Sequence, residues 1–122
     1  MTPVGHSVGS IVRGKHLLAD FYGVQARLLQ DCSALENLLR EAATAASAHI
    51  LFCHLHSFGP EQGVTGVLLL AESHISIHTW PECSYAAIDI FMCGQAEPEL
   101  ALRVLEQALR PSRNTLQTVQ RG

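Results

Sequence analysis

Two stretches of the chain carry apolar residues at the spacing of an amphipathic helix. Over residues 26–46, apolar side chains recur every three or four positions, with charged and polar side chains between them. The second stretch begins at Pro98, since proline is common in the first turn of a helix, and continues until Pro111. The pattern therefore predicts two helices, one in each half of the chain.

Six shorter segments have the pattern of β-strands. Residues 74–80 alternate, so that Ile75, Ile77 and Thr79 would face one side of a sheet while the side chains between them face the other. Residues 66–71 form an unbroken apolar run, which is typical of a buried strand. The six predicted strands cover residues 16–22, 49–58, 66–71, 74–80, 85–93 and 115–119.

The order of these elements, β-α-β-β-β-β-α-β, predicts an α+β fold. Short links join the central strands and suit hairpins, so we expect a two-layer sandwich, a largely antiparallel sheet with both helices on one face. The other face would carry aromatic rings beside histidines, which rarely remain open to solvent over a wide area. We therefore expect a homodimer in which a second sheet covers this face, giving four layers, α/β/β/α. Cover by the chain's own helices and loops is the alternative.

Length and charge narrow the class of protein. The 122 residues fit a single domain over 1–122, with a flexible segment over 1–14 where no periodicity is present. The balance of 8 Lys+Arg against 11 Asp+Glu gives a net charge of −3, which argues against nucleic-acid binding. No apolar run reaches the length of about 18 residues that a membrane span needs, and the first residues lack the apolar segment of a secretory signal. Four cysteines without a CxxC pair indicate reduced thiols in a cytoplasmic protein.

The chain has an unusual number of histidines, 7 in 122 residues. His54 and His56 would share one strand face, as would His74 and His78, and such pairs could hold a metal ion. Their spacing matches no structural zinc pattern, so we predict no metal and expect His54, His56 and His74 to be hydrogen-bonded, half-buried side chains. A metal-binding module is thus the weakest of the functions considered.

A different chemistry is possible where Glu72-Ser73 interrupts two apolar strands, as a tight turn does. A serine hydroxyl held in such a turn can attack the preceding carbonyl carbon if a base removes its proton and donors stabilise the oxyanion. His78 has the right titration range for the proton transfers, and Cys93 completes a nucleophilic set. Composition and spacing are compatible with this self-cleavage chemistry but do not favour it over the other functions considered.

The segment over 63–94, GVTGVLLLAESHISIHTWPECSYAAIDIFMCG, closely resembles the bacterial and archaeal S-adenosylmethionine decarboxylase proenzymes. That family carries an ESHxxIHTWPE core followed by YAAID and a CG pair. The segment over 14–23, GKHLLADFYG, resembles the first strand of the same family. The longer match alone covers about a quarter of the chain, with very specific motifs.

The resemblance implies an inactive proenzyme that cleaves itself between Glu72 and Ser73. The Ser73 hydroxyl attacks the Glu72 carbonyl, and β-elimination of the resulting ester leaves a β chain of residues 1–72 and an α chain of residues 73–122. Ser73 becomes a pyruvoyl group, the covalent cofactor that forms a Schiff base with the substrate and takes up electrons as CO₂ leaves. By the same resemblance, His78 accepts a proton during processing and Cys93 donates one in catalysis. The product is the aminopropyl donor for spermidine.

The resemblance also suggests residues that bind S-adenosylmethionine. Family sites place aromatic rings against the adenine base of the substrate, and Phe58 and Trp80 are the candidates for these rings. The alternative for both is an ordinary position in the core. Asp20 aligns where many relatives have Glu, and its alternative is a solvated strand residue. Glu72 becomes a free carboxylate beside the site, unless it only marks the cleaved bond. Thr65 stands where many relatives have a serine associated with processing.

One departure from the family pattern concerns a turn, and two alternative functions remain open. Cys83-Ser84 stands where relatives commonly have Xaa-Gly, so we expect a different turn before Tyr85 and an unchanged function. The same pyruvoyl machinery could decarboxylate arginine or ornithine in place of S-adenosylmethionine. A further alternative is an unprocessed, silent homologue that binds an active subunit. The presence of Ser73, His78 and Cys93 argues against it.

Overall fold

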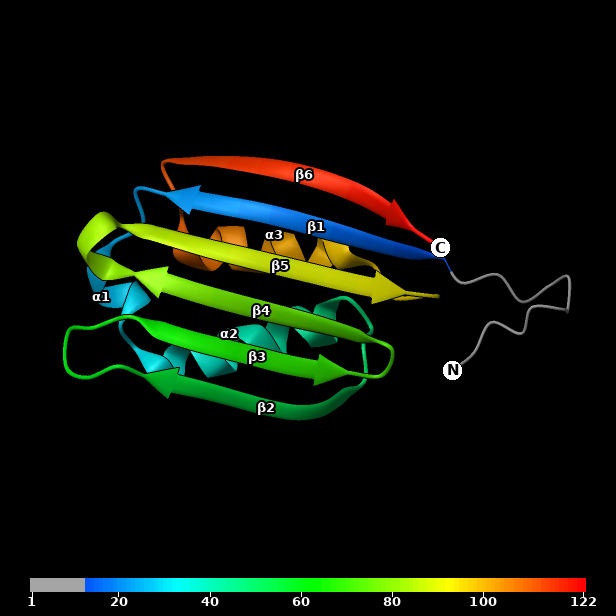
Figure 1. Cartoon of the computed structure of the whole chain (residues 1–122), viewed down its shortest axis with the longest axis horizontal. Helices are drawn as coiled ribbons and strands as arrows, with labels where there is room; N and C mark the ends of the chain where they lie inside the picture. The colour runs from blue at the N-terminus through cyan, green and yellow to red at the C-terminus, as the bar shows by residue number, and fades with distance from the viewer. Residues whose placement is uncertain (1–12) are drawn as a thin grey trace, which may run out of the picture.

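Six strands form one antiparallel sheet in the computed structural model, which describes residues 13–122 (Figure 1). The strands are β1 (Gly14–Tyr22), β2 (Ile50–Ser57), β3 (Val64–Leu70), β4 (Ser73–Trp80), β5 (Tyr85–Cys93) and β6 (Arg113–Arg121). Their order across the sheet is β2-β3-β4-β5-β1-β6, with antiparallel neighbours throughout. Because short connections join β2 to β5 in sequence, hairpins build this part of the sheet, and β1 then pairs with β5.

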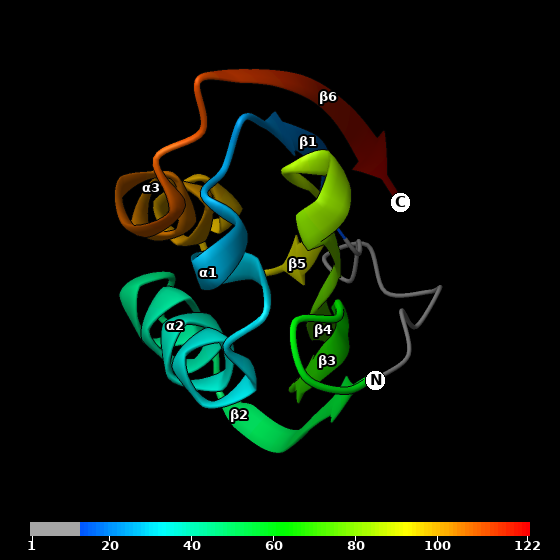
Figure 2. The same cartoon turned by 90° about the vertical axis from the view of Figure 1, so that its left-hand side faces the viewer.

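The helices α1 (Ala26–Leu29), α2 (Cys32–Ala45) and α3 (Pro98–Leu109) lie on one side of the sheet (Figure 2). A 3₁₀ turn, η1 (Pro81–Cys83), connects β4 to β5. The expected α+β arrangement, an antiparallel sheet with its helices on one face, is therefore confirmed. In the described residues, no helix has both the length and the apolar character needed to cross a membrane.

The single helix expected over residues 26–46 is in fact two helices. The Asp31 side chain accepts a hydrogen bond from the backbone N–H of Ala34 at 3.0 Å, which caps the start of α2. Such a cap satisfies an amide that has no partner inside the helix, so a new helix begins there. The apolar pattern continues across the break, which explains why spacing alone does not reveal it.

The core lies between the helices and the sheet face that they cover. Ile75 and Ile77 of β4 are completely buried there, as are Leu35 and Leu39 of α2. Burying each such side chain stabilises the fold by roughly 1.5–3 kcal/mol. The alternation over residues 74–80 therefore predicts the buried face correctly.

Thr79 is the polar member of this buried face. Its hydroxyl donates to the Leu29 carbonyl oxygen at 2.6 Å and accepts the Val64 amide at 2.9 Å. Both partners lie outside β4, so this one hydroxyl ties the end of α1 and the start of β3 to the end of β4. The neighbouring Trp80 is thereby attached to a fixed strand end.

The expectations for the two ends of the chain need correction. Of the flexible segment expected over 1–14, residues 1–12 lie outside the described part of the chain, while Gly14 belongs to β1 and pairs with Cys93 and Arg121. The last strand, expected over 115–119, extends over Arg113–Arg121 and pairs with β1 along its whole length. Every residue of β6 is exposed, so the strand is held by backbone pairing alone. Its sequence therefore shows no alternation of buried and exposed residues from which its length could be predicted.

We call the sheet face without helices the open face. It carries the second set of alternate side chains, among them His74, His78 and Trp80 of β4. In the single chain, Phe52 is 54%, Leu69 45% and Trp80 40% exposed on this face. The chain's own helices therefore leave a partly apolar face uncovered.

Candidate active site

A two-residue turn, Ala71-Glu72, connects β3 to β4 at one end of the sheet. Leu70 and Ser73 pair across the hairpin, and the Ala71 N–H donates to the His49 carbonyl oxygen at 2.9 Å. Glu72 has a φ of 60°, a left-handed conformation that costs a residue with a side chain about 1–2 kcal/mol. The tight turn expected here is present, and its strain falls on the residue before Ser73.

Ser73 lies beside the end of β5. The backbone N–H of Cys93 donates to Ser73 Oγ at 3.3 Å, so the hydroxyl oxygen is held by a main-chain donor. Burial, with a smaller contribution from the nearby Glu72 carboxylate, raises the pKa of the Cys93 thiol. The structure thus brings three sequence-predicted residues, Glu72, Ser73 and Cys93, to one end of the sheet.

His78 does not belong to this group in the single chain. It lies five residues beyond Ser73 on the same strand, which separates the two by about 17 Å at the rise of a β-strand. Its Nδ1 lies 3.1 Å from the Thr65 hydroxyl oxygen of β3, the residue directly opposite in the hairpin. Thr65 therefore orients the His78 ring, whose second nitrogen has no hydrogen-bond partner within residues 13–122.

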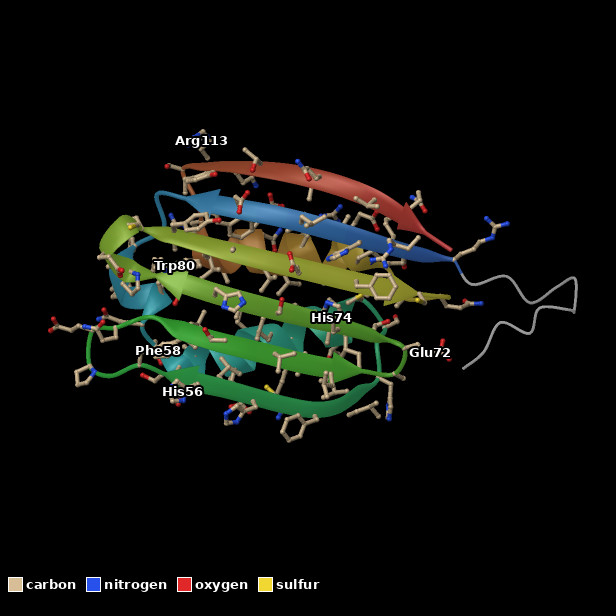
Figure 3. The ribbon with its side chains drawn as sticks, viewed as in Figure 1. His56, Phe58, Glu72, His74, Trp80 and Arg113 are labelled. Carbon is tan, nitrogen blue, oxygen red and sulfur yellow. The ribbon has the colours of Figure 1, made fainter. Side chains whose placement is uncertain are left out.

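A cleft of about 290 Å³ opens around His78. Its walls are formed by Phe58, Gln62, Gly63, Thr65, His78, Thr79, Trp80 and Glu82. Gly63 permits the close approach of two segments, because a Cβ atom there would lie 2.1 Å from the Thr79 carbonyl oxygen. Figure 3 shows Phe58 and Trp80 toward one end of the sheet and Glu72 at the other.

Phe58 and Trp80 are not core residues, although that was the alternative for both. Phe58 is 62% exposed and Trp80 is 40% exposed, and both line the cleft. The His56 ring lies edge-on against Phe58 with 4.7 Å between ring centroids. Two exposed rings at one cleft are suited to hold a flat, apolar ring between them.

Asp20 lies outside this cleft, in an interior strand of the sheet. The Tyr85 hydroxyl donates to its Oδ1 at 2.5 Å, and the Thr115 hydroxyl donates to its Oδ2 at 3.3 Å. The hydrogen bond to Asp20, followed by burial, raises the pKa of Tyr85 to about 12. Asp20 is thus a bonded carboxylate rather than a solvated strand residue. Sequence reasoning did not assign its partner Tyr85 a role, although Tyr85 is the first residue of the YAAID motif.

The remaining histidines form no metal site in the described residues, where no three His, Cys, Asp or Glu side chains could share an ion. His16 and His74 lie on the open face with 6.1 Å between ring centroids, both against Phe91. Burial, and then the neighbouring His16, lowers the pKa of His74. Of the three histidines expected to be half-buried, only His74 is, because His54 and His56 of β2 are exposed. Among the described residues, the buried His16 Nε2 has no hydrogen-bond partner.

The turn before Tyr85 depends on an unusual conformation of Ser84. Ser84 has φ 53° and ψ 37°, the left-handed conformation that glycine adopts freely. Its N–H donates to the Pro81 carbonyl oxygen at 3.1 Å, and its carbonyl accepts the Val24 amide at 3.0 Å. Ser84 therefore adopts a conformation in which glycine is common.

Comparison with known proteins identifies the family. A family model described as S-adenosylmethionine decarboxylase matches residues 15–122, nearly the whole of the described chain. The chain belongs to this family. A protein of Methanococcus maripaludis strain S2, named S-adenosylmethionine decarboxylase proenzyme, is 42% identical over 110 residues, 89% of each chain. A protein of the same name from Parasynechococcus marenigrum is 48% identical over 109 residues, 88% of this chain and 84% of its own.

A solved structure agrees with the sequence comparisons. The crystal structure of the adenosylmethionine decarboxylase from Aquifex aeolicus VF5 is 40% identical and superposes with a TM-score of 0.79. The match covers 89% of this chain and 90% of that one. The solved structure therefore supports the same fold, an antiparallel sheet with its helices on one face.

Proposed function

We propose that this chain is a proenzyme that cleaves itself between Glu72 and Ser73 and then decarboxylates S-adenosylmethionine. The single observation that carries the proposal is the strained Glu72 directly before Ser73, with Ser73 Oγ bound by the Cys93 amide, in a chain of this family. The two products would be residues 1–72 and 73–122, and the latter would begin with a pyruvoyl group.

The turn favours attack of Ser73 on the bond before it. The Ser73 hydroxyl oxygen adds to the Glu72 carbonyl carbon, the C–N bond breaks, and an ester replaces the peptide. Release of the left-handed Glu72 conformation offsets part of the cost of this step. Removal of the Ser73 α-proton then breaks the Cβ–O bond, so Glu72 leaves with the oxygen as a carboxylate. Tautomerisation and hydrolysis of the remaining dehydroalanine release ammonia and leave the ketone.

The backbone amide of Cys93 supports the same reaction, ester formation followed by β-elimination. It donates to the oxygen that leaves with Glu72, and this oxygen gains negative charge as the Cβ–O bond breaks. The residues present therefore fit formation of the prosthetic group at Ser73. Once formed, the pyruvoyl group supplies an electron sink for the electrons that CO₂ leaves behind.

A second copy of the chain would bring the base to this end of the sheet. His78 and Ser73 are about 17 Å apart along β4, too far for proton transfer within one chain. The open face is partly apolar, and His78 lies on it. Packing two open faces with antiparallel strand directions would place each His78, oriented by Thr65, over the Ser73 end of its partner. We therefore infer a homodimer of α/β/β/α layers whose two sites each combine both chains.

The cleft beside His78 supports an adenosine-containing substrate. Phe58 and Trp80 offer two exposed ring faces at its walls, and an adenine ring fits between such faces. Arginine and ornithine have no flat apolar ring to place there. The observation thus favours S-adenosylmethionine over the basic amino acids.

Cys93 is the group that would return a proton to the substrate carbon after CO₂ leaves. Its raised pKa keeps the thiol protonated at neutral pH, the form that an acid needs. The decarboxylated product would serve as an aminopropyl donor, as in spermidine synthesis. A silent, unprocessed homologue would need none of these contacts.

Intact-protein mass spectrometry tests the proposal. After incubation, the protein should give two masses, the second lighter by one ammonia than a fragment beginning with serine. Ser73→Ala should remain a single chain, because alanine has no attacking oxygen. Release of CO₂ from S-adenosylmethionine, measured beside arginine and ornithine, then identifies the substrate. A wild-type chain that stays intact after long incubation would contradict the proposal.

A further inference from the structure

Four side chains form a continuous stack across the open face beside the candidate cleft. Trp80 and Tyr85 are directly opposed in the β4–β5 pair, and their rings are 5.2 Å apart with 23° between planes. Tyr85 and Tyr22 are opposed in the β5–β1 pair, 5.3 Å apart with 26° between planes. The Arg113 guanidinium of β6 lies 4.0 Å from the Tyr22 ring centroid. We call Trp80, Tyr85, Tyr22 and Arg113 the aromatic stack.

The aromatic stack begins at the cleft and ends at the edge of the sheet. Trp80 and Arg113, its two ends, are marked in Figure 3. One flank of Trp80 faces the cleft that Phe58 and His78 line, and Tyr85 stacks on its ring from the adjacent strand. Stacking between aromatic rings, and of a cation on an aromatic ring, is favourable beyond the burial of area. The exposed Trp80 ring is therefore supported from behind.

A hydrogen bond fixes the middle of the aromatic stack. The Tyr85 hydroxyl donates to Asp20 at 2.5 Å, and Thr115 of β6 donates to the other carboxylate oxygen at 3.3 Å. Tyr85 consequently has two restraints, its ring between two aromatic neighbours and its hydroxyl on a charged acceptor. Charge-assisted hydrogen bonds of this kind are stronger than neutral ones.

We propose that Tyr85, anchored by Asp20, is a positioning residue that holds the Trp80 ring in the orientation needed to stack on the substrate's adenine. The proposal rests on the proposed function, because it takes adenine as the ring that enters the cleft. Asp20 acts through Tyr85 and does not touch the substrate. The aromatic stack thereby contributes to selection of a nucleoside-containing substrate over a simple amino acid, since a loose Trp80 would offer no defined face.

Trp80 is the single tryptophan of the chain, so its fluorescence reports on this ring alone. The experiment compares the processed wild-type enzyme with Tyr85→Leu, Tyr85→Phe and Asp20→Asn. Phe52→Leu is the matched control, because Phe52 is an exposed ring on β2 of the same face, outside the aromatic stack. Acrylamide quenching and anisotropy of Trp80 are measured without substrate, and kcat and KM are measured with S-adenosylmethionine.

Tyr85→Leu should at least double the quenching constant of Trp80 and raise KM about tenfold, the upper end of what an aromatic pair contributes. Its kcat should change little, because the lost contact serves binding equally before and during reaction. Tyr85→Phe keeps the ring and loses only the anchor, so KM should rise about fivefold, the scale of one hydrogen bond. Asp20→Asn keeps an acceptor but loses its charge, so KM should rise by less than in Tyr85→Phe. The control Phe52→Leu should remain near wild type.

Unchanged Trp80 quenching or unchanged KM in Tyr85→Leu would overturn the proposal. An equal effect of Phe52→Leu would also overturn it, since any aromatic loss on the open face would then suffice. If Tyr85→Leu does not fold, Tyr85→Phe applies the same test with the ring retained. If wild type shows neither cleavage nor decarboxylation, the proposed function fails. The quenching comparison in the intact chain then still decides whether Tyr85 holds Trp80.

Discussion

If His78 acts on the Ser73 of a second copy, two chains that each fail to process should restore cleavage when they are combined. A Ser73→Ala chain lacks the attacking oxygen and keeps the base. A His78→Ala chain keeps the serine and lacks the base. The structure separates these two residues by about 17 Å along β4, so one chain cannot unite them. In a mixed dimer, one site would contain both groups and the other would contain neither.

The expected yield follows from random assortment. When the two chains are co-expressed in equal amounts, about half of the dimers contain one of each, and each mixed dimer has one competent site. About a quarter of all chains should therefore be cleaved, which is about half of the His78→Ala chains. The chain that is cleaved is the one that lacks His78, because it alone carries Ser73.

Different affinity tags on the two chains make this measurable. Mixed dimers are purified through both tags, and denaturing electrophoresis then shows which tag has moved to a shorter fragment. Each variant expressed alone serves as the control, with hydroxylamine added to detect a His78→Ala chain that stops at the ester. Purified mixed dimers without any cleavage would refute the shared site. Full processing of His78→Ala on its own would remove His78 from the mechanism.

Four smaller predictions follow from individual contacts. Processed Cys93→Ser should lose about 10²–10⁴-fold in decarboxylation rate, the scale of a lost general acid, with alanine appearing at the α-chain terminus. Glu72→Gln should move the alkaline loss of kcat to lower pH, because the Glu72 carboxylate helps to raise the pKa of the Cys93 thiol. Ser84→Gly should raise the free energy of unfolding by about 1 kcal/mol in urea titrations, since glycine adopts the left-handed φ of 53° without strain. The hydrogen bond from Lys15 at 2.6 Å lowers the pKa of Glu99, so Glu99→Gln should cost less than about 1 kcal/mol at neutral pH for this exposed pair. This cost should disappear as the pH falls through the Glu99 pKa, because the wild-type pair is lost there.

The parts of the fold that bury side chains are those that the sequence predicts well. Ile75 and Ile77 alternate with polar residues because one face of β4 is in the core, and the same reasoning assigns the buried face of β5. Elements that depend on the backbone are predicted less well. β6 pairs with β1 over nine residues without burying any, and the break before α2 depends on one hydrogen bond from Asp31. Neither feature changes the apolar pattern.

The candidate site shows the same division. Glu72, Ser73 and Cys93 lie together because two neighbouring strands end there, which a motif with fixed spacing already implies. The bond between Asp20 and Tyr85 joins residues 65 apart in the sequence, and only the β1–β5 register brings them together. No local pattern marks such a pair. The family resemblance suggests a substrate contact for Asp20, whereas its hydrogen bonds suggest support for an aromatic ring.

The length of β4 explains how one short strand can serve two sites in a dimer. Ser73 begins the strand and Trp80 ends it, so the cleavage end and the cleft end lie about 23 Å apart on one chain. A two-fold axis lying between two open faces, across the strands and above the middle of β4, would exchange these ends. Each Ser73 would then meet the partner's cleft, and the same rotation would complete the second site. A one-residue shift in the β3–β4 register would turn His78 toward the core. The hairpin that contains the strained Glu72 therefore also determines that His78 lies on the open face.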